Sequence, residues 1–336
     1  MDNKINGRRL KTFFTYDVIK TIAVSLIVCV LLTLIFNALG KKATDGQSFK
    51  ILVGDDIISG EDEYKAYNTA ISSGALGYGF SYEILTGGIT NLSAKGNYGA
   101  AYMLNTFHEI GDDDVFIASE TLAVSYVKSG WAIKIKSLDG SYGEDTYVGL
   151  AYKYLKSNGF YEDETADYND VNEQKVRENF IKTRGKDSRF NNAEKKESGV
   201  KKETERIKGL KKNIDAFKNL IETCPDLLAS SEKLTEFKVS EKVVFKGCYL
   251  MNLGALGDSF INAFKVAVKK TEEEGGTQSS GGSSRSGETE YTKDGIYLAI
   301  GNYAKKSSDL FFETAAYVLS LVKEFGTAEQ KAAIGL

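Results

Sequence analysis

The chain has 336 residues, of which 42% are hydrophobic and 26% charged. This composition is typical of globular proteins and excludes a largely disordered chain or one that crosses a membrane many times. The formal net charge of −3 divides into +3 in residues 1–40 and −6 in the remainder. Because the large remainder has no cationic excess to neutralise phosphates, the sequence argues against nucleic acid as a partner.

The first predicted element is a transmembrane helix over residues 21–39, a stretch without any charged residue. Nineteen helical residues span about 28 Å, which matches the ~30 Å hydrocarbon core of a lipid bilayer. Basic residues are more numerous before this stretch than after it. The positive-inside bias therefore predicts a signal anchor in the cell membrane, with a cytoplasmic N-terminus at 1–20 and an extracytoplasmic domain at 41–336.

Strands and helices alternate in the following part of the chain. Strands are predicted at 49–53, 80–85 and 115–118, and helices near 61–72, 100–109 and 121–129. Such alternation predicts an α/β fold in which helices cover a sheet with parallel pairing across the crossovers. Residues 131–135 alternate apolar and polar side chains, which is typical of a half-buried strand.

Residues 171–216 are dominated by Lys, Glu, Asn and Arg. From residue 207 to residue 224, apolar residues recur at helical spacing: Ile207, Leu210, Ile214, Phe217, Ile221 and Cys224. We expect a long amphipathic helix that packs on its own domain. A coiled coil that binds a partner is the alternative, although fewer than three clean heptads are visible.

Residues 271–290 contain no large apolar side chain and are rich in Gly and Ser, which predicts a flexible loop. A strand at 295–300 and an apolar helix at 310–322 are predicted after it. The loop is therefore expected to be an insertion within the domain.

The order of these elements, with Asp114-Val115-Phe116 entering a helix that closes at Lys128-Ser129-Gly130-Trp131, resembles the type 2 periplasmic solute-binding proteins. More narrowly, it resembles the members of Gram-positive bacteria in which an N-terminal helix replaces the lipid anchor. The resemblance covers residues 48–138 and, more loosely, 290–325.

That resemblance implies a two-lobed α/β domain with a cleft between the lobes. Lobe 1 would comprise about 48–140 and a C-terminal return at 290–336. Lobe 2 would comprise about 141–270.

Ligands of open α/β sheets bind beyond the carboxyl ends of the strands. The loops after the predicted strands, together with a tyrosine able to stack on a sugar or peptide, supply the candidate ligand-binding residues, which are Asp55, Asp56, Thr86, Gly87, Ser119, Glu120 and Tyr147. The alternative interpretation is that Gly and Asp at these places make turns and cap helices.

No motif for a nucleophile, a nucleotide or a metal is present, so we expect no enzyme activity, no cofactor and no metal site. A hydrolase would need two facing acids such as Asp55 and Glu120. The run Asp112 to Asp114 is predicted to be a solvated turn, and His108 has no second histidine or cysteine with which to share a metal. Cys224 and Cys248 are expected to be buried free thiols, with a disulfide as the open alternative.

Two functions follow as expectations. The first is a binding protein, anchored in the lipid bilayer through residues 21–39, that captures a small solute for an ABC importer or a sensor or is associated with one. The second is an interaction protein without a ligand, which uses the charged region Asn172 to Lys212 to contact another membrane protein.

Overall fold

The computed structural model describes residues 7, 11, 18–39, 48–54, 57–58, 86–92, 96–239, 242–257, 260, 267–269, 291–292, 295–302 and 312–336. The chain divides into two compact units, Met1–Lys42 and Ala43–Leu336. The predictions for 61–72, 80–85 and 271–290, and those for Asp55 and Asp56, concern residues outside this described set.

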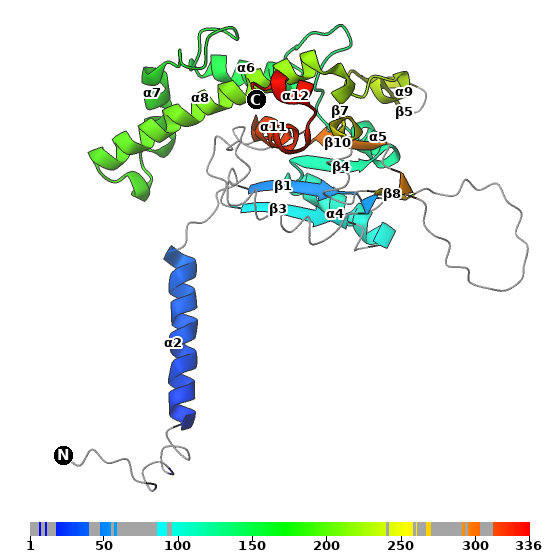
Figure 1. Ribbon diagram of the computed structural model, residues 1–336. Helices are drawn as coiled ribbons and strands as arrows, with labels where there is room; N and C mark the ends of the chain where they lie inside the picture. Colours follow the sequence, from blue (N-terminus) through cyan, green and yellow to red (C-terminus); the bar gives the residue numbers. More distant parts are fainter. Residues whose placement is uncertain are drawn as a thin grey trace, which may run out of the picture. The chain divides into compact units, whose positions relative to one another are not determined.

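The first unit contains helix α2, Val18–Leu39, which is 22 residues long (Figure 1). All of its side chains from Ile22 to Ile35 are exposed, and ten of them are large and apolar. Among the residues that the structure describes, no helix is long and apolar enough to cross a membrane. The transmembrane helix at 21–39 stays a prediction.

The second unit is a mixed α/β structure built on a five-stranded sheet with the order β3-β1-β4-β10-β7 (Figure 1). Its strands are β1 (Ser48–Val53), β3 (Thr86–Asn91), β4 (Val115–Ser119), β7 (Leu250–Asn252) and β10 (Ile296–Ile300). Strands β3, β1 and β4 are parallel, and β10 pairs antiparallel with both β4 and β7. Strand β10, which comes late in the sequence, therefore lies between β4 and β7 in the same sheet as the early strands β1 and β3.

Helices cover both faces of this sheet. Successive residues of β4 belong to two different hydrophobic clusters, with Val115 and Ile117 in one and Phe116 and Ala118 in the other. The first cluster is completed by α6 (Tyr147–Ser157), α8 (Ala193–Thr223), α11 (Glu313–Phe325) and α12 (Ala328–Ala333). The second is completed by α4 (Gly96–Ile110) and α5 (Glu120–Lys128). Burial on both faces explains why the central strands are almost continuously apolar.

The remaining elements are short. Strands β5 (Glu236–Val239) and β6 (Lys242–Lys246) form a hairpin, and β2 (Ile57–Ile58), β8 (Ala267–Lys269) and β9 (Tyr291–Thr292) form a small sheet. Helix α9 spans Glu232–Thr235, and the 3₁₀ turns η3, η4 and η5 span Ser188–Phe190, Pro225–Leu227 and Leu253–Leu256.

Several predicted elements are present within one to four residues of the expected bounds, namely β1, α4, β4, α5, β10 and α11. Two of the predictions for single elements are wrong. Thr86-Gly87-Gly88 is not a loop but the start of β3, because its backbone pairs in register with β1 from Ser48 onward. Residues 131–135 form no strand and make only isolated bridges, including Ala132 with Gly301.

The charged middle of the chain folds as two helices rather than one. Helix α7, Glu173–Arg184, precedes η3, and α8 then begins after Asn192, whose side chain accepts a hydrogen bond from the Lys195 amide. All six apolar positions predicted between 207 and 224 are buried, five of them on α8 and Cys224 at its C-cap. The apolar face of this helix is thus confirmed.

A separate second lobe is not evident among the described residues. Residues 43–336 form one compact unit. The range 141–270, expected to build lobe 2, instead supplies β7 to the central sheet and α6 and α8 to one of its faces.

Candidate functional site

The predicted binding edge of the sheet is only partly assembled. Because β1, β3 and β4 are parallel, their carboxyl ends lie at one edge, and the Gly54 amide donates a hydrogen bond of 2.8 Å to the Ile117 carbonyl there. Thr86 and Gly87 lie at the opposite edge, since Thr86 is the first residue of β3 and pairs with Ser48, the first residue of β1. The prediction that they join Ser119 at one rim is therefore wrong.

The two predicted residues at the carboxyl end of β4 have contacts of their own. Ser119 is buried at the N-cap of α5. The carboxylate of Glu120 forms an ion pair with Lys233, an exposed lysine of α9. This ion pair and the accompanying hydrogen bond raise the pKa of the Lys233 amine. A ligand at this edge would have to compete with that pair.

Tyr147 lies in the core. Its side chain is fully buried, and its hydroxyl accepts a hydrogen bond of 2.9 Å from the Ala315 amide of α11. Burial raises the pKa of its hydroxyl well above the usual range. The expected stacking of Tyr147 on a ligand is wrong for this reason: the ring packs in the core beside Phe217.

The aspartates before β4 do not form a solvated turn. Asp113 is fully buried, and its Oδ2 accepts a hydrogen bond of 2.6 Å from the Tyr126 hydroxyl and lies 2.8 Å from His108 Nδ1. The His108 ring stacks on Trp131, with ring centroids 4.6 Å apart. Asp114 accepts a hydrogen bond of 2.7 Å from the Lys50 amide of β1. The run therefore ties α4, α5 and β1 together at the amino end of β4, a structural role.

Metal and thiol chemistry have no assembled site in the described part of the chain. No group of three or more His, Cys, Asp or Glu residues lies close enough together there to hold a metal ion. Cys224 and Cys248 are free, as predicted, and both are buried. Burial raises the pKa of both thiols, which lowers the fraction of reactive thiolate.

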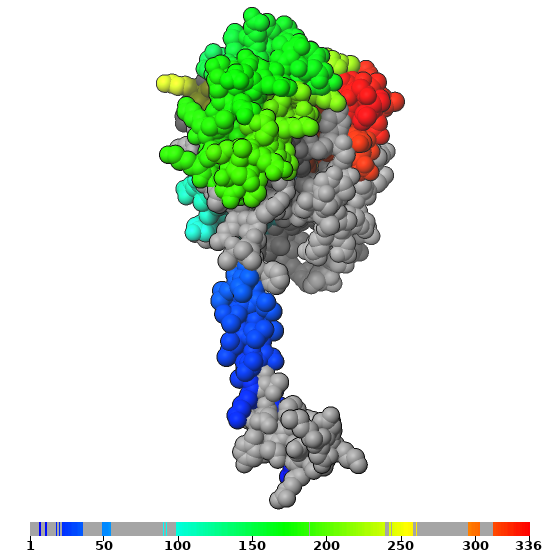
Figure 2. All heavy atoms as spheres, turned by 90° about the vertical axis from the view of Figure 1, so that its left-hand side faces the viewer, coloured from blue at the N-terminus to red at the C-terminus, as the bar shows by residue number. Residues whose placement is uncertain are grey.

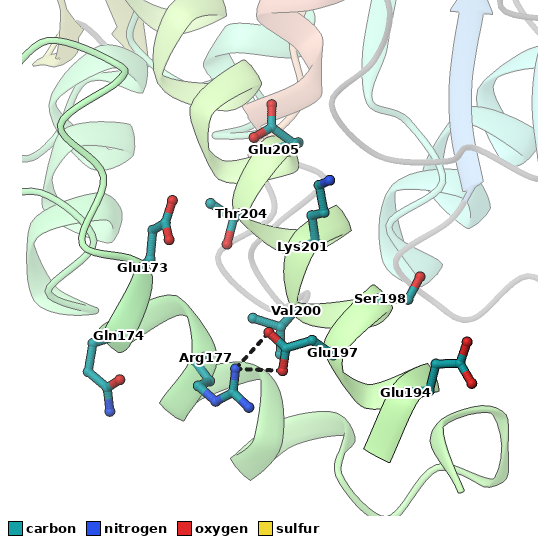
Figure 3. A pocket seen from close by; sticks show the side chains of 10 residues that line it. All are labelled: Glu173, Gln174, Arg177, Glu194, Glu197, Ser198, Val200, Lys201, Thr204 and Glu205. Carbon is teal, nitrogen blue, oxygen red and sulfur yellow. Dashed lines mark hydrogen bonds and ion pairs between the residues drawn. The ribbon is translucent and has the colours of Figure 1, made fainter. Parts of the chain in front are cut away.

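An open groove of about 800 Å³ lies between α7 and the first half of α8 (Figure 3). Arg177 of α7 reaches across it to Glu197 of α8, with Nη1 2.7 Å from Oε2. The lining residues are Glu173, Gln174, Arg177, Glu194, Glu197, Ser198, Val200, Lys201, Thr204 and Glu205. Such a wall offers both signs of charge and several hydrogen-bonding groups.

The groove is supported by packed apolar side chains. Phe180 of α7 and Phe190 of η3 meet edge to face, with ring centroids 4.9 Å apart. Both rings lie against Gly199 of α8, where the missing side chain lets the helices approach closely. Val176 of α7 and Val200 of α8 are also buried. The two helices therefore present the groove as a packed unit.

We call residues 172–212, which contain both helices, the arm. The arm carries 14 basic and 7 acidic residues, a net charge of +7, so the rest of the chain carries −10. In Figure 2 the green atoms of this region face the viewer. The net charge of the whole chain hides this separation of positive and negative charge. A count of net charge in a sliding window along the sequence would have found it.

Comparison with protein-family models, with curated proteins and with solved structures found no match.

Proposed function

We propose that this chain is a membrane-anchored interaction protein that contacts another protein through the arm. The observation that carries the proposal is the α7–α8 groove, which combines a packed apolar support with an open, mixed-charge wall. A hydrolytic role has less support, because the acids named for it are Asp55 and Glu120, and Glu120 is paired with Lys233. The proposed activity is binding without catalysis, and it requires no cofactor.

The membrane anchor is part of the proposal. Residues 21–39 carry no charge, and α2 exposes ten large apolar side chains between Ile22 and Ile35. Exposed apolar surface of that extent is unfavourable in water and favourable in a bilayer. With the bias of basic residues toward the N-terminus, the proposal places the arm outside the cytoplasm at the cell membrane.

The polar surface of the arm favours a reversible contact. Two of its ion pairs, Arg177 with Glu197 and Lys175 with Glu178, are exposed, and exposed pairs are weak and easily exchanged for pairs with a partner. Charged surfaces of this kind steer association and select partners. The proposed contact is therefore expected to weaken as salt concentration rises.

Site-specific photo-crosslinking in membranes tests this proposal. A photoreactive residue replaces Ser198, which lines the groove, and in the matched control it replaces Lys128, an exposed residue of α5 outside the arm. We expect a discrete protein adduct from position 198 and none from position 128. Equal adducts from both positions, or none from position 198, would contradict the proposed function.

A second candidate is the capture of a small solute for an ABC importer or a sensor. The parallel arrangement of β1, β3 and β4 favours it, because the carboxyl ends of such strands are a common place for ligands. Thermal melting of the full chain against sugars, peptides, amino acids, phosphate and metal ions tests this candidate. A ligand at 100 times its dissociation constant adds ~2.7 kcal/mol to the free energy of unfolding. No shift with any compound would leave the interaction protein as the better proposal.

A further inference from the structure

Two patches of opposite charge lie at the two ends of α7. The acidic loop, residues 162–170, contains five acidic residues and no basic one. Its five acids, Glu162, Asp163, Glu164, Asp167 and Asp170, are all exposed. Hydrogen bonds from Thr165 lower the pKa of Asp163, which therefore stays ionised at neutral pH.

The basic tip, residues 182–196, connects α7 to α8 and carries six basic residues against two acidic ones. Lys182, Lys186 and Lys195 are exposed and form no ion pair with any residue that the structure describes. Ile181, immediately before the tip, leaves 45% of its surface in solvent. The tip therefore offers unpaired positive charge beside an apolar side chain.

The two patches cannot neutralise each other within one chain. Helix α7 has 12 residues, so it separates them by ~18 Å at ~1.5 Å per residue. The Debye length at physiological ionic strength is only ~8 Å. The dipole of α7 favours acidic residues at its N-terminus and basic residues at its C-terminus. It amounts to only about half an elementary charge at each end, which is far less than the charge of either patch.

We propose that two copies of this chain associate through their arms and the acidic loops that precede them, with the acidic loop of each copy on the basic tip of the other. Helix α7 has opposite charges at its two ends, so two antiparallel copies of it are complementary. A twofold axis perpendicular to α7 makes the two loop-to-tip contacts equivalent, so both form together. Twofold interfaces of this self-complementary kind are the commonest in homo-oligomers. The pairing also brings the two Ile181 side chains into the interface.

This inference rests on the proposed function and names the partner of the arm as a second copy. An acidic surface of a different protein would satisfy the basic tip, but it would leave the acidic loop without a partner. A second copy satisfies both patches, which is why we favour it.

Charge reversal with complementation tests the pairing in the full chain in detergent. The tip variant carries Lys182→Glu, Lys186→Glu and Lys195→Glu. The loop variant carries Glu162→Lys, Glu164→Lys and Asp170→Lys, and it spares Asp163 and Asp167, whose carboxylates hold turns. The control variant carries Lys128→Glu, Lys238→Glu and Lys242→Glu, which reverse three exposed lysines outside the arm.

We expect sedimentation to give a dimer for the wild type and the control. The tip and loop variants should each bind themselves at least about tenfold more weakly, because like charges then face each other. An equimolar mixture of these two variants should recover the dimer, since each then meets a complementary partner at both contacts. Neutral versions of both variants, with Lys→Gln at the three tip positions and with Glu162→Gln, Glu164→Gln and Asp170→Asn in the loop, keep the test valid if a charge-reversed chain loses its helical circular dichroism.

Three outcomes would overturn the inference: a monomeric wild type, variants that dimerise like the wild type, or a mixture that stays monomeric. The photo-crosslink from position 198 separates this failure from a failure of the proposed function. An adduct with a different protein would keep the proposed function and reject self-association. The absence of any adduct would reject both.

Discussion

The backbone of Gly199 on α8 lies directly against the ring of Phe180 on α7. A Cβ atom at this position would lie 2.5 Å from Cζ of Phe180. Gly199→Val should therefore separate the helices of the arm and cost about 1–3 kcal/mol, because overpacking forces neighbouring groups out of their places. Thermal melting followed by circular dichroism measures the loss.

Ser198→Val is the control for the Gly199 variant, since Ser198 is exposed on the same helix and receives the same β-branched side chain. Trypsin should also cut the Gly199 variant faster within the arm. Equal melting temperatures for the two variants would show that the contact contributes nothing.

Tyr126→Phe removes the hydroxyl that donates to the buried carboxylate of Asp113. A hydrogen bond to a charged group contributes about 1.5–3 kcal/mol, so the free energy of unfolding in urea should fall by that amount. The comparison is Tyr249→Phe, a buried tyrosine whose hydroxyl has no hydrogen bond to the described residues. If both variants lower the free energy of unfolding by the same amount, the loss in Tyr126→Phe does not come from the hydrogen bond to Asp113.

Buried tyrosines make the fold sensitive to alkali. Burial raises the pKa of Tyr126, Tyr147 and Tyr152 above the usual value, and a neighbouring carboxylate adds to this effect at Tyr126 and Tyr152. The folded state thus holds these protons more tightly than the unfolded state. The contribution of these protonated tyrosines to the free energy of unfolding is fully present below about pH 10, the pKa of tyrosine in the unfolded chain. It is lost as the pH rises above that value.

Urea unfolding between about pH 8 and pH 11 measures this loss, and ultraviolet absorbance follows tyrosine ionisation. The three tyrosines should ionise only as the chain unfolds. Ionisation of all 19 tyrosines near pH 10 in the folded protein would contradict the prediction.

Counting the reactive thiols of the chain tests whether Cys224 and Cys248 are free. In the Cys29→Ser variant, Cys224 and Cys248 should react slowly with a thiol reagent while the chain is folded, because both are buried and burial raises the pKa of both thiols. After denaturation without a reductant, two thiols per chain should react. A count of zero would mean a disulfide instead.

The anchor has a direct test. Arginine at the centre of a membrane helix costs about 2.5–3.5 kcal/mol by insertion scales, so Val28→Arg with Leu31→Arg should release the full chain from the membrane fraction. Val28→Leu with Leu31→Val is the control. Both residues lie in the exposed apolar part of α2. Membrane retention of the double arginine variant would argue against a transmembrane anchor.

The central strands were predictable because their side chains are apolar over several successive residues, as in Val115-Phe116-Ile117-Ala118 of β4. Strand β3 was not, because Thr86-Gly87-Gly88 has the composition of a loop and becomes a strand only through backbone pairing with β1. Pairing between distant segments is a tertiary effect that a local pattern does not contain.

The candidate site was the least predictable part. The buried position of Tyr147 depends on α11, because the Ala315 amide of that helix, 168 residues further along the chain, donates a hydrogen bond to the Tyr147 hydroxyl. The groove depends on the packing of Gly199 against Phe180, and a single glycine in a charged helix gives no signal of that contact. The charged region Asn172 to Lys212 was recognised in the sequence, but its net charge of +7 was not, because the opposite charge of the remaining residues nearly cancels it in the whole-chain sum.

Strand β10 has a consequence for biosynthesis. It pairs with β4 across about 180 intervening residues, as in Ile300 with Val115. At ~5–20 residues per second, the ribosome needs roughly 10–40 s to supply that partner. Throughout this time the edge of β4 is an open template for mispairing with other nascent chains. A chain truncated before Ile296 would keep that edge permanently, so we expect such fragments to aggregate and to be degraded.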